Sequence, residues 1–119
     1  MKKLAFLLAL ALVTISGTLS AQNTITAENI QVNISAATSR EDLSAIRTQC
    51  LEQGIEFNYT PRFNQNRQLT GIAFILKRTG GDLLGQTGMI ELTVPNSKAS
   101  FRLHKENNKF VADCIGSCE

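Results

Sequence analysis

The chain has 119 residues and a formal net charge of +2 at pH 7, and 43% of its residues are hydrophobic. This length allows one domain with a modest core. Two of the 12 basic residues, Lys2 and Lys3, belong to the N-terminal segment, so 10 basic side chains stand against 10 acidic ones in the rest of the chain. This balance, with no cluster of basic residues, gives no electrostatic reason to expect nucleic acid or an anionic membrane surface as a partner.

The first 21 residues have the pattern of a secretory signal peptide. Lys2 and Lys3 precede an unbroken apolar run over residues 4–13, and small and polar residues follow as far as Ala21. The run is too short for a bilayer-spanning helix. Lipid attachment would need a cysteine just after this run, and the first cysteine of the chain is Cys50. We therefore expect residues 1–21 to be a signal peptide and residues 22–119 to form one small periplasmic or secreted domain without a membrane span.

The first expected elements of this domain are a strand and a capped helix. Apolar and polar residues alternate over residues 30–34, which is typical of a half-buried strand. Two capping boxes fit the start of the helix that follows, Thr38 with Glu41 or Ser39 with Asp42. Either pair would satisfy free amide groups of the first helical turn.

The helix is expected to bury one face and to end before a glycine. Leu43, Ile46 and Cys50 recur at helical spacing, and Gly54 tolerates the left-handed backbone conformation that commonly follows a helix. Cys50 therefore belongs to the apolar face.

Strands are expected over most of the remaining chain. Pro61 should lie at the end of a strand or on an edge strand. The apolar phase changes between Leu69 and Ile72, so one extra residue near Gly71 predicts a β-bulge. Alternating apolar residues predict strands over residues 55–60, 69–77, 90–94 and 100–105, with a less marked one over 109–114.

This order predicts an α+β fold with one helix packed on a mostly antiparallel sheet, in β-α-β-β-β-β order, and one further C-terminal strand as an option. Each strand has one apolar face, so one face of the sheet should be covered and the other solvated. One helix is too small to cover all these strands. Either the sheet curls on itself or a partner covers the remainder.

The three cysteines are Cys50, Cys114 and Cys118. An oxidising compartment favours a structural disulfide, and the short separation of Cys114 and Cys118 makes them the favoured pair. Their spacing also fits half of a zinc site, but the chain offers His104 and scattered carboxylates as the only further ligands. We expect no metal and no cofactor.

Two connections are candidate contact surfaces for a partner. Residues 79–88 are rich in glycine but lack the Gly-Lys-Ser/Thr ending of a phosphate-binding loop. We interpret them as a mobile hairpin loop, on which Leu83 and Leu84 either contact a partner or fold back onto the core. Asn96 lies in the second connection, a turn over residues 95–97.

One segment combines a capped helix, a Gly-Ile helix exit and a hairpin, with its characteristic residues at Thr38–Leu43, Ile46, Cys50, Gly54–Tyr59, Asn64 and Leu69–Ile72. This segment resembles a module of known proteins. The resemblance is to small secreted proteins of Bacteroidetes-type bacteria and to the extracytoplasmic part of BlaR/MecR-type sensor metallopeptidases. Arg67 stands where a turn glycine is expected, and Cys50 where a leucine is expected. The resemblance covers about a third of the chain and implies an accessory or sensory role, and since no His-Glu-x-x-His motif occurs, it carries over no catalytic residue.

These observations favour a non-enzymatic binding or accessory module of the bacterial cell envelope with a protein partner there. An inhibitor or sensor module for an extracytoplasmic peptidase is the first alternative. A small enzyme is the second, with Cys50 as nucleophile and His104 as base. The pattern disfavours the enzyme, because Cys50 lies on the apolar helix face and His104 alternates with an inward leucine.

Overall fold

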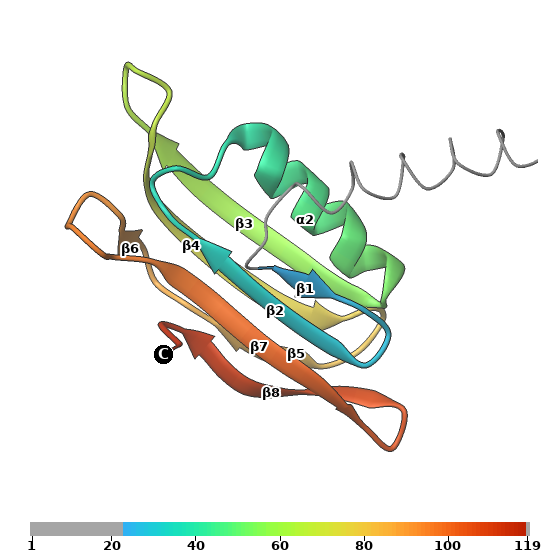
Figure 1. Cartoon of the computed structure of the whole chain (residues 1–119). Coiled ribbons are helices and arrows are strands. Elements are labelled where there is room, and N and C mark those ends of the chain that lie inside the picture. The colour runs from blue at the N-terminus through green and yellow to red at the C-terminus, as the bar shows by residue number, and fades with distance from the viewer. Residues whose placement is uncertain (1–22, 119) are drawn as a thin grey trace, which may run out of the picture.

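The fold is that of a computed structural model, which describes residues 23–118, so the expected signal peptide lies outside the described residues. Within residues 23–118, no helix is long and apolar enough to cross a membrane. In chain order the elements are β1 (Thr24–Ile25), β2 (Asn29–Ile34), α2 (Arg40–Glu52), β3 (Ile55–Phe63), β4 (Leu69–Arg78), β5 (Leu83–Gln86), β6 (Ile90–Glu91), β7 (Ala99–Glu106) and β8 (Lys109–Gly116) (Figure 1).

The strands form two antiparallel sheets. One sheet has the order β1-β2-β7-β8, and the other has the order β3-β4-β5 with β6 also paired to β4. The α+β class and the antiparallel pairing are confirmed, whereas the expectation of a single sheet is wrong. Alternation of apolar residues shows which face of a strand is buried but not which strand lies across the core.

The two sheets pack face to face through aromatic side chains. Phe101 of β7 lies with its ring centroid 5.4 Å from those of both Phe57 on β3 and Phe74 on β4. The rings are tilted against each other, as aromatic pairs prefer. The second sheet therefore covers the apolar face that the helix leaves open.

Helix α2 packs against β3 (Figure 1). Of the two expected capping boxes, the structure contains the one at Ser39 and Asp42. The Ser39 Oγ accepts from the Asp42 N–H at 3.0 Å, and an Asp42 carboxylate oxygen accepts from the Ser39 N–H at 3.1 Å. The buried face carries Leu43, Ile46 and Cys50, as the spacing predicts.

The predicted bulge lies at Thr70, next to Gly71. Arg62 pairs with Gly71 and Phe63 pairs with Leu69, so Thr70 is the extra residue. Pro61 lies on β3, an edge strand of its sheet, where a missing N–H leaves the ladder intact. Both expectations are confirmed.

The strand expected over residues 90–94 is wrong beyond Glu91. The Leu92 N–H still donates to the Thr70 carbonyl at 2.9 Å, and Leu92 is buried. β4 begins at Leu69, directly after the hairpin turn that joins it to β3, so residues 93 and 94 have no strand beside them. Val94 is consequently 58% exposed.

The glycine-rich connection contains a strand that its sequence does not predict. β5 pairs with β4 and lies against β8 of the other sheet. A Cβ atom at Gly85 would lie 2.4 Å from the Ile115 Cδ1, so this close approach of the two edge strands requires glycine. The interpretation of residues 79–88 as an entire mobile loop is therefore wrong.

Candidate functional site

A groove of about 650 Å³ lies next to the contact between β5 and β8. This volume is within the range of small-molecule sites in proteins. Three segments form it: the end of β5 with the start of β6, the turn before β7, and the end of β8. We call it the end groove. Its lining residues are Gln86, Thr87, Ile90, Asn96, Ser97, Lys98, Ile115, Gly116 and Ser117.

The first wall of the end groove is fixed by Thr87. Its N–H donates to the Phe74 carbonyl at 2.9 Å, and its Oγ1 accepts from the Phe74 N–H at 3.1 Å. Thr87 thus extends the pairing of β5 with β4 by one residue. The neighbouring Gln86 is held at the edge of the sheet with its side chain exposed.

The second wall is the turn that contains Asn96 and Ser97. Asn96 has φ of 64°, a left-handed conformation that asparagine tolerates better than most residues. The Ser97 N–H donates to the Val94 carbonyl at 3.0 Å, and its hydroxyl donates to the Glu91 carbonyl at 2.5 Å. The turn is therefore tied back to the end of β6.

The third wall is the C-terminal tail. Cys114 and Cys118, the pair that the sequence favours, form a disulfide with their Cα atoms 5.8 Å apart. The Cys118 N–H also donates to the Ser100 hydroxyl at 2.6 Å, which gives this 1% exposed side chain a partner. These two bonds hold Ile115 and Ser117 against the groove.

The chemistry of the lining favours binding. Ile90 and Ile115 are half-buried and pack against the core, while amide and hydroxyl side chains surround them. Lys98 is the one ionisable side chain among the lining residues. The lining therefore offers apolar contact, neutral hydrogen-bonding groups and one positive charge, and it holds no acid–base pair.

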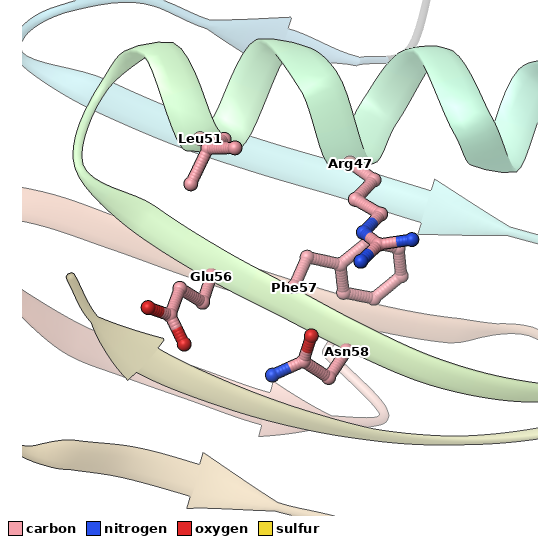
Figure 2. A pocket seen from close by; sticks show the side chains of 5 residues that line it. All are labelled: Arg47, Leu51, Glu56, Phe57 and Asn58. Carbon is pink, nitrogen blue, oxygen red and sulfur yellow. The ribbon is translucent and has the colours of Figure 1, made fainter.

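A smaller groove of about 280 Å³ lies between α2 and β3 (Figure 2). Arg47 and Leu51 line it from the helix. The Phe57 side chain turns inward and is 1% exposed, whereas Glu56 and Asn58 point away from the helix (Figure 2). Because its polar groups do not converge, we do not treat this groove as the functional site.

The predicted contact residues separate in the structure. Asn96 lines the end groove. Leu83 is 55% exposed on the outer face of its sheet, opposite Lys77, and Leu84 is half-buried against the core. The two predicted connections do meet, since residues 86–87 and 96–98 both line the end groove. The sequence analysis did not identify the C-terminal tail as part of this site. The pair Cys114 and Cys118 was the one sequence signal that could have located it.

Cys50 and His104 do not form a catalytic pair. Cys50 is buried on α2, where burial raises the pKa of its thiol to about 12. His104 lies on β7 with Nδ1 2.7 Å from an Asp113 carboxylate oxygen and Nε2 3.1 Å from one of Glu106. These carboxylates lie at different ring nitrogens, so the three groups cannot converge on one ion. Residues 23–118 contain no His/Cys/Asp/Glu cluster suited to a metal.

No family model matches the chain, and no curated protein or solved structure matches it either.

Proposed function

We propose that this chain is a secreted, non-enzymatic binding module of the bacterial cell envelope and that its partner occupies the end groove. One observation carries the proposal: both connections that the sequence marks as contact surfaces meet at this groove, together with a tail fixed by a disulfide. The lining offers groups that bind and none that transfers protons between an acid and a base. A disulfide also suits an oxidising compartment outside the cytoplasm.

A second, more specific form of this role is a sensor or inhibitor module for an extracytoplasmic peptidase. The resemblance of residues 38–72 to the outer part of sensor metallopeptidases supports it. In that case the peptidase would contact the same surface, because the expected contact loops were residues 78–88 and 95–99 and both contribute lining residues to the end groove. The two forms differ in the partner and not in the site.

The proposal is tested by blocking the groove without touching the core. Gln86 is exposed at its rim, so Gln86→Trp would fill it. Thr48→Trp is the matched control, because Thr48 is exposed on α2 and lines neither groove. Each tagged mature protein is used to isolate partners from the native envelope, and each recovered partner is then titrated in purified form.

We expect the wild type and Thr48→Trp to bind one partner with equal affinity and Gln86→Trp to bind it at least tenfold more weakly. Equal binding by all three proteins would place the contact elsewhere and overturn the proposal. The proposal would also be overturned if every recovered partner bound Gln86→Trp as tightly as Thr48→Trp, or if no partner were recovered.

A further inference from the structure

The sheet of β3, β4, β5 and β6 has an outer face that the pairing register defines. Residues directly opposite each other on neighbouring strands share a face, and successive residues alternate between the two faces. Phe57 and Phe74 are buried in the core, so Asn58 and the Ile75 opposite it point outward. We call this surface the outer sheet face. Its four rows are Arg62 with Gly71 and Glu91, Thr60 with Ala73, Asn58 with Ile75 and Gln86, and Glu56 with Lys77 and Leu83.

Apolar side chains gather on the outer sheet face. Of the five large hydrophobic side chains that are exposed among residues 23–118, Ile75, Leu83 and Met89 lie here. Met89 lies over Gly71, because its Sδ is 3.0 Å from the place that a Gly71 Cβ would take. Exposed apolar side chains that gather on one face indicate an interaction surface.

The charged side chains of the outer sheet face lie in its two end rows. Arg62 forms an ion pair with Glu91 at one end, and Glu56 lies opposite Lys77 at the other. The two middle rows contain no charged residue. The end rows are separated by the length of β4 from Gly71 to Lys77, which is about 20 Å. Along β3 the face is therefore positive at one end and negative at the other.

We propose that the outer sheet face binds a second copy of this chain in a symmetric dimer. The two-fold axis lies in the plane of the interface and runs across the strands. Each end row of one copy then faces the opposite end row of its partner, so Arg62 faces the partner's Glu56. Because a two-fold interface repeats every contact, each dimer contains this pair twice. The inference goes beyond the proposed function and does not depend on it.

The charges select both the occupant and the direction of the axis. With the axis across the strands, Lys77 faces the partner's Gly71, beside the partner's Glu91. With the axis along β4, Lys77 would face the partner's Lys77, and like charges in that position are repulsive. The face is therefore complementary to itself in one of these two orientations.

The uncharged rows fit the same arrangement. Ile75 lies across from the partner's Ala73, so a large side chain meets a small one on both sides of the axis. Leu83 lies across from the end row over which the partner's Met89 is placed. The face is only about 20 Å long and about 10 Å wide between the outer strands, so it buries less surface than stable complexes do, and the dimer exchanges with the monomer.

The test measures self-association of the mature, oxidised protein by sedimentation equilibrium, from about 1 µM to about 1 mM, the range in which a small interface dissociates. Glu56→Arg and Arg62→Glu are measured alone and as an equimolar mixture. In the mixed dimer one contact keeps the native pair and the other has the pair exchanged, so both contacts are attractive. Arg47→Glu and Glu52→Arg, both exposed on α2, are the matched controls.

We expect the wild type and both controls to dimerise with the same dissociation constant. Glu56→Arg and Arg62→Glu should each dimerise at least tenfold more weakly, and their mixture should recover the wild-type affinity. The inference would be overturned by a wild type that stays monomeric over the whole range, by a mixture that associates no better than its components, or by equal losses in the controls.

A second pair of variants tests the apolar part of the face. Ile75→Asp should prevent dimerisation, because it places a charge at the centre of the contact. Leu51→Asp, at an exposed leucine of α2, should dimerise like the wild type. Unchanged dimerisation of Ile75→Asp would place the contact elsewhere and overturn the inference.

The outcome is independent of the test of the end groove. Gln86 lies on the outer sheet face and also lines the end groove, whereas Glu56, Arg62 and Ile75 do not line it. If these three positions have no effect on self-association while Gln86→Trp still weakens binding of an envelope partner, the dimer is wrong and the proposed function stands. If the mixture recovers the dimer and Gln86→Trp binds every partner normally, the proposed function is wrong and the dimer stands.

Discussion

The guanidinium of Arg78 joins the two sheets through the main chain of Phe110. Its Nε and Nη2 donate to the Phe110 carbonyl at 3.0 and 2.6 Å, and its Nη1 lies 2.9 Å from an Asp82 carboxylate oxygen. Arg78 belongs to β4 and Phe110 to the edge strand β8. The contact thus occupies a main-chain acceptor that an edge strand would otherwise present to another chain.

Arg78→Ala should lower the free energy of unfolding by about 2 kcal/mol, because each hydrogen bond from a charged donor contributes roughly 1.5–3 kcal/mol and the carbonyl regains water. Arg78→Lys should recover only part of this loss, since an ammonium cannot supply the fork of two donors. Urea unfolding of the variants measures the difference. Arg47→Ala, an exposed arginine of α2, should change stability by less than about 0.5 kcal/mol. Equal losses at both arginines would contradict the role of the Phe110 contact.

His104 should make stability depend on pH. The hydrogen bond to Glu106, followed by that to Asp113 and the charges of both carboxylates, raises the pKa of His104 above its usual 6.5. A raised pKa in the folded state means that the imidazolium stabilises the fold below about pH 6.5 and that this contribution is lost as pH rises through the folded pKa.

We therefore expect the wild type to be more stable than His104→Gln at pH 5.5, with the difference shrinking by pH 8.5. Urea midpoints of the two proteins across this range measure the effect. Asn29→Gln, at the position opposite His104 on β2, should leave the pH dependence unchanged. A constant difference between wild type and His104→Gln would show that the histidine does not titrate with folding.

The turn between β3 and β4 should gain stability from glycine. Arg67 has φ of 65°, a conformation that costs a residue with a Cβ roughly 1–2 kcal/mol. Glycine avoids this strain but loses more freedom on folding, by roughly 0.5–1 kcal/mol. Arg67→Gly should therefore raise the free energy of unfolding by about 0.5–1 kcal/mol in urea titration, and Arg67→Ala should not raise it. A loss with glycine would contradict this account.

The helix could be predicted closely because its signals are local. The capping residues, the apolar spacing and the glycine that follows all lie within Ser39–Gly54. The bulge at Thr70 was also predictable, since it changes the apolar phase of one strand. β5 was not predictable, because Leu83 and Leu84 do not alternate and the strand exists through its pairing with β4.

The end groove depends on contacts between distant segments, so the sequence marked its parts without joining them. Asn96 and the connection before it were marked as contact surfaces. Nothing local shows that Ser117 returns to the same place, because that follows from the bond between Cys118 and Ser100 and from the disulfide. Sequence patterns report burial and turns, whereas a site between two sheets requires their packing.

The disulfide should matter more for the end groove than for global stability. Closing so short a loop contributes about 2 kcal/mol or less in the chain-entropy model. Reduction, or replacement of both Cys114 and Cys118 by serine, should therefore leave the domain folded. Amide exchange at residues 115–117 should become faster, and exchange within α2 should not change. Unchanged protection of the tail after reduction would show that the hydrogen bond to Ser100 holds it alone.

Cys50 should be an inert core thiol. Its side chain is fully buried on α2, and burial raises its pKa to about 12, so very little thiolate forms near neutral pH. Iodoacetamide at pH 8 should label no cysteine in the oxidised folded protein and one in 8 M urea. Cys50→Ser should cost about 1–3 kcal/mol, because it places a hydroxyl among apolar side chains, and Cys50→Val should cost less. Rapid labelling of the folded protein would contradict this burial and would return Cys50 to consideration as a reactive group.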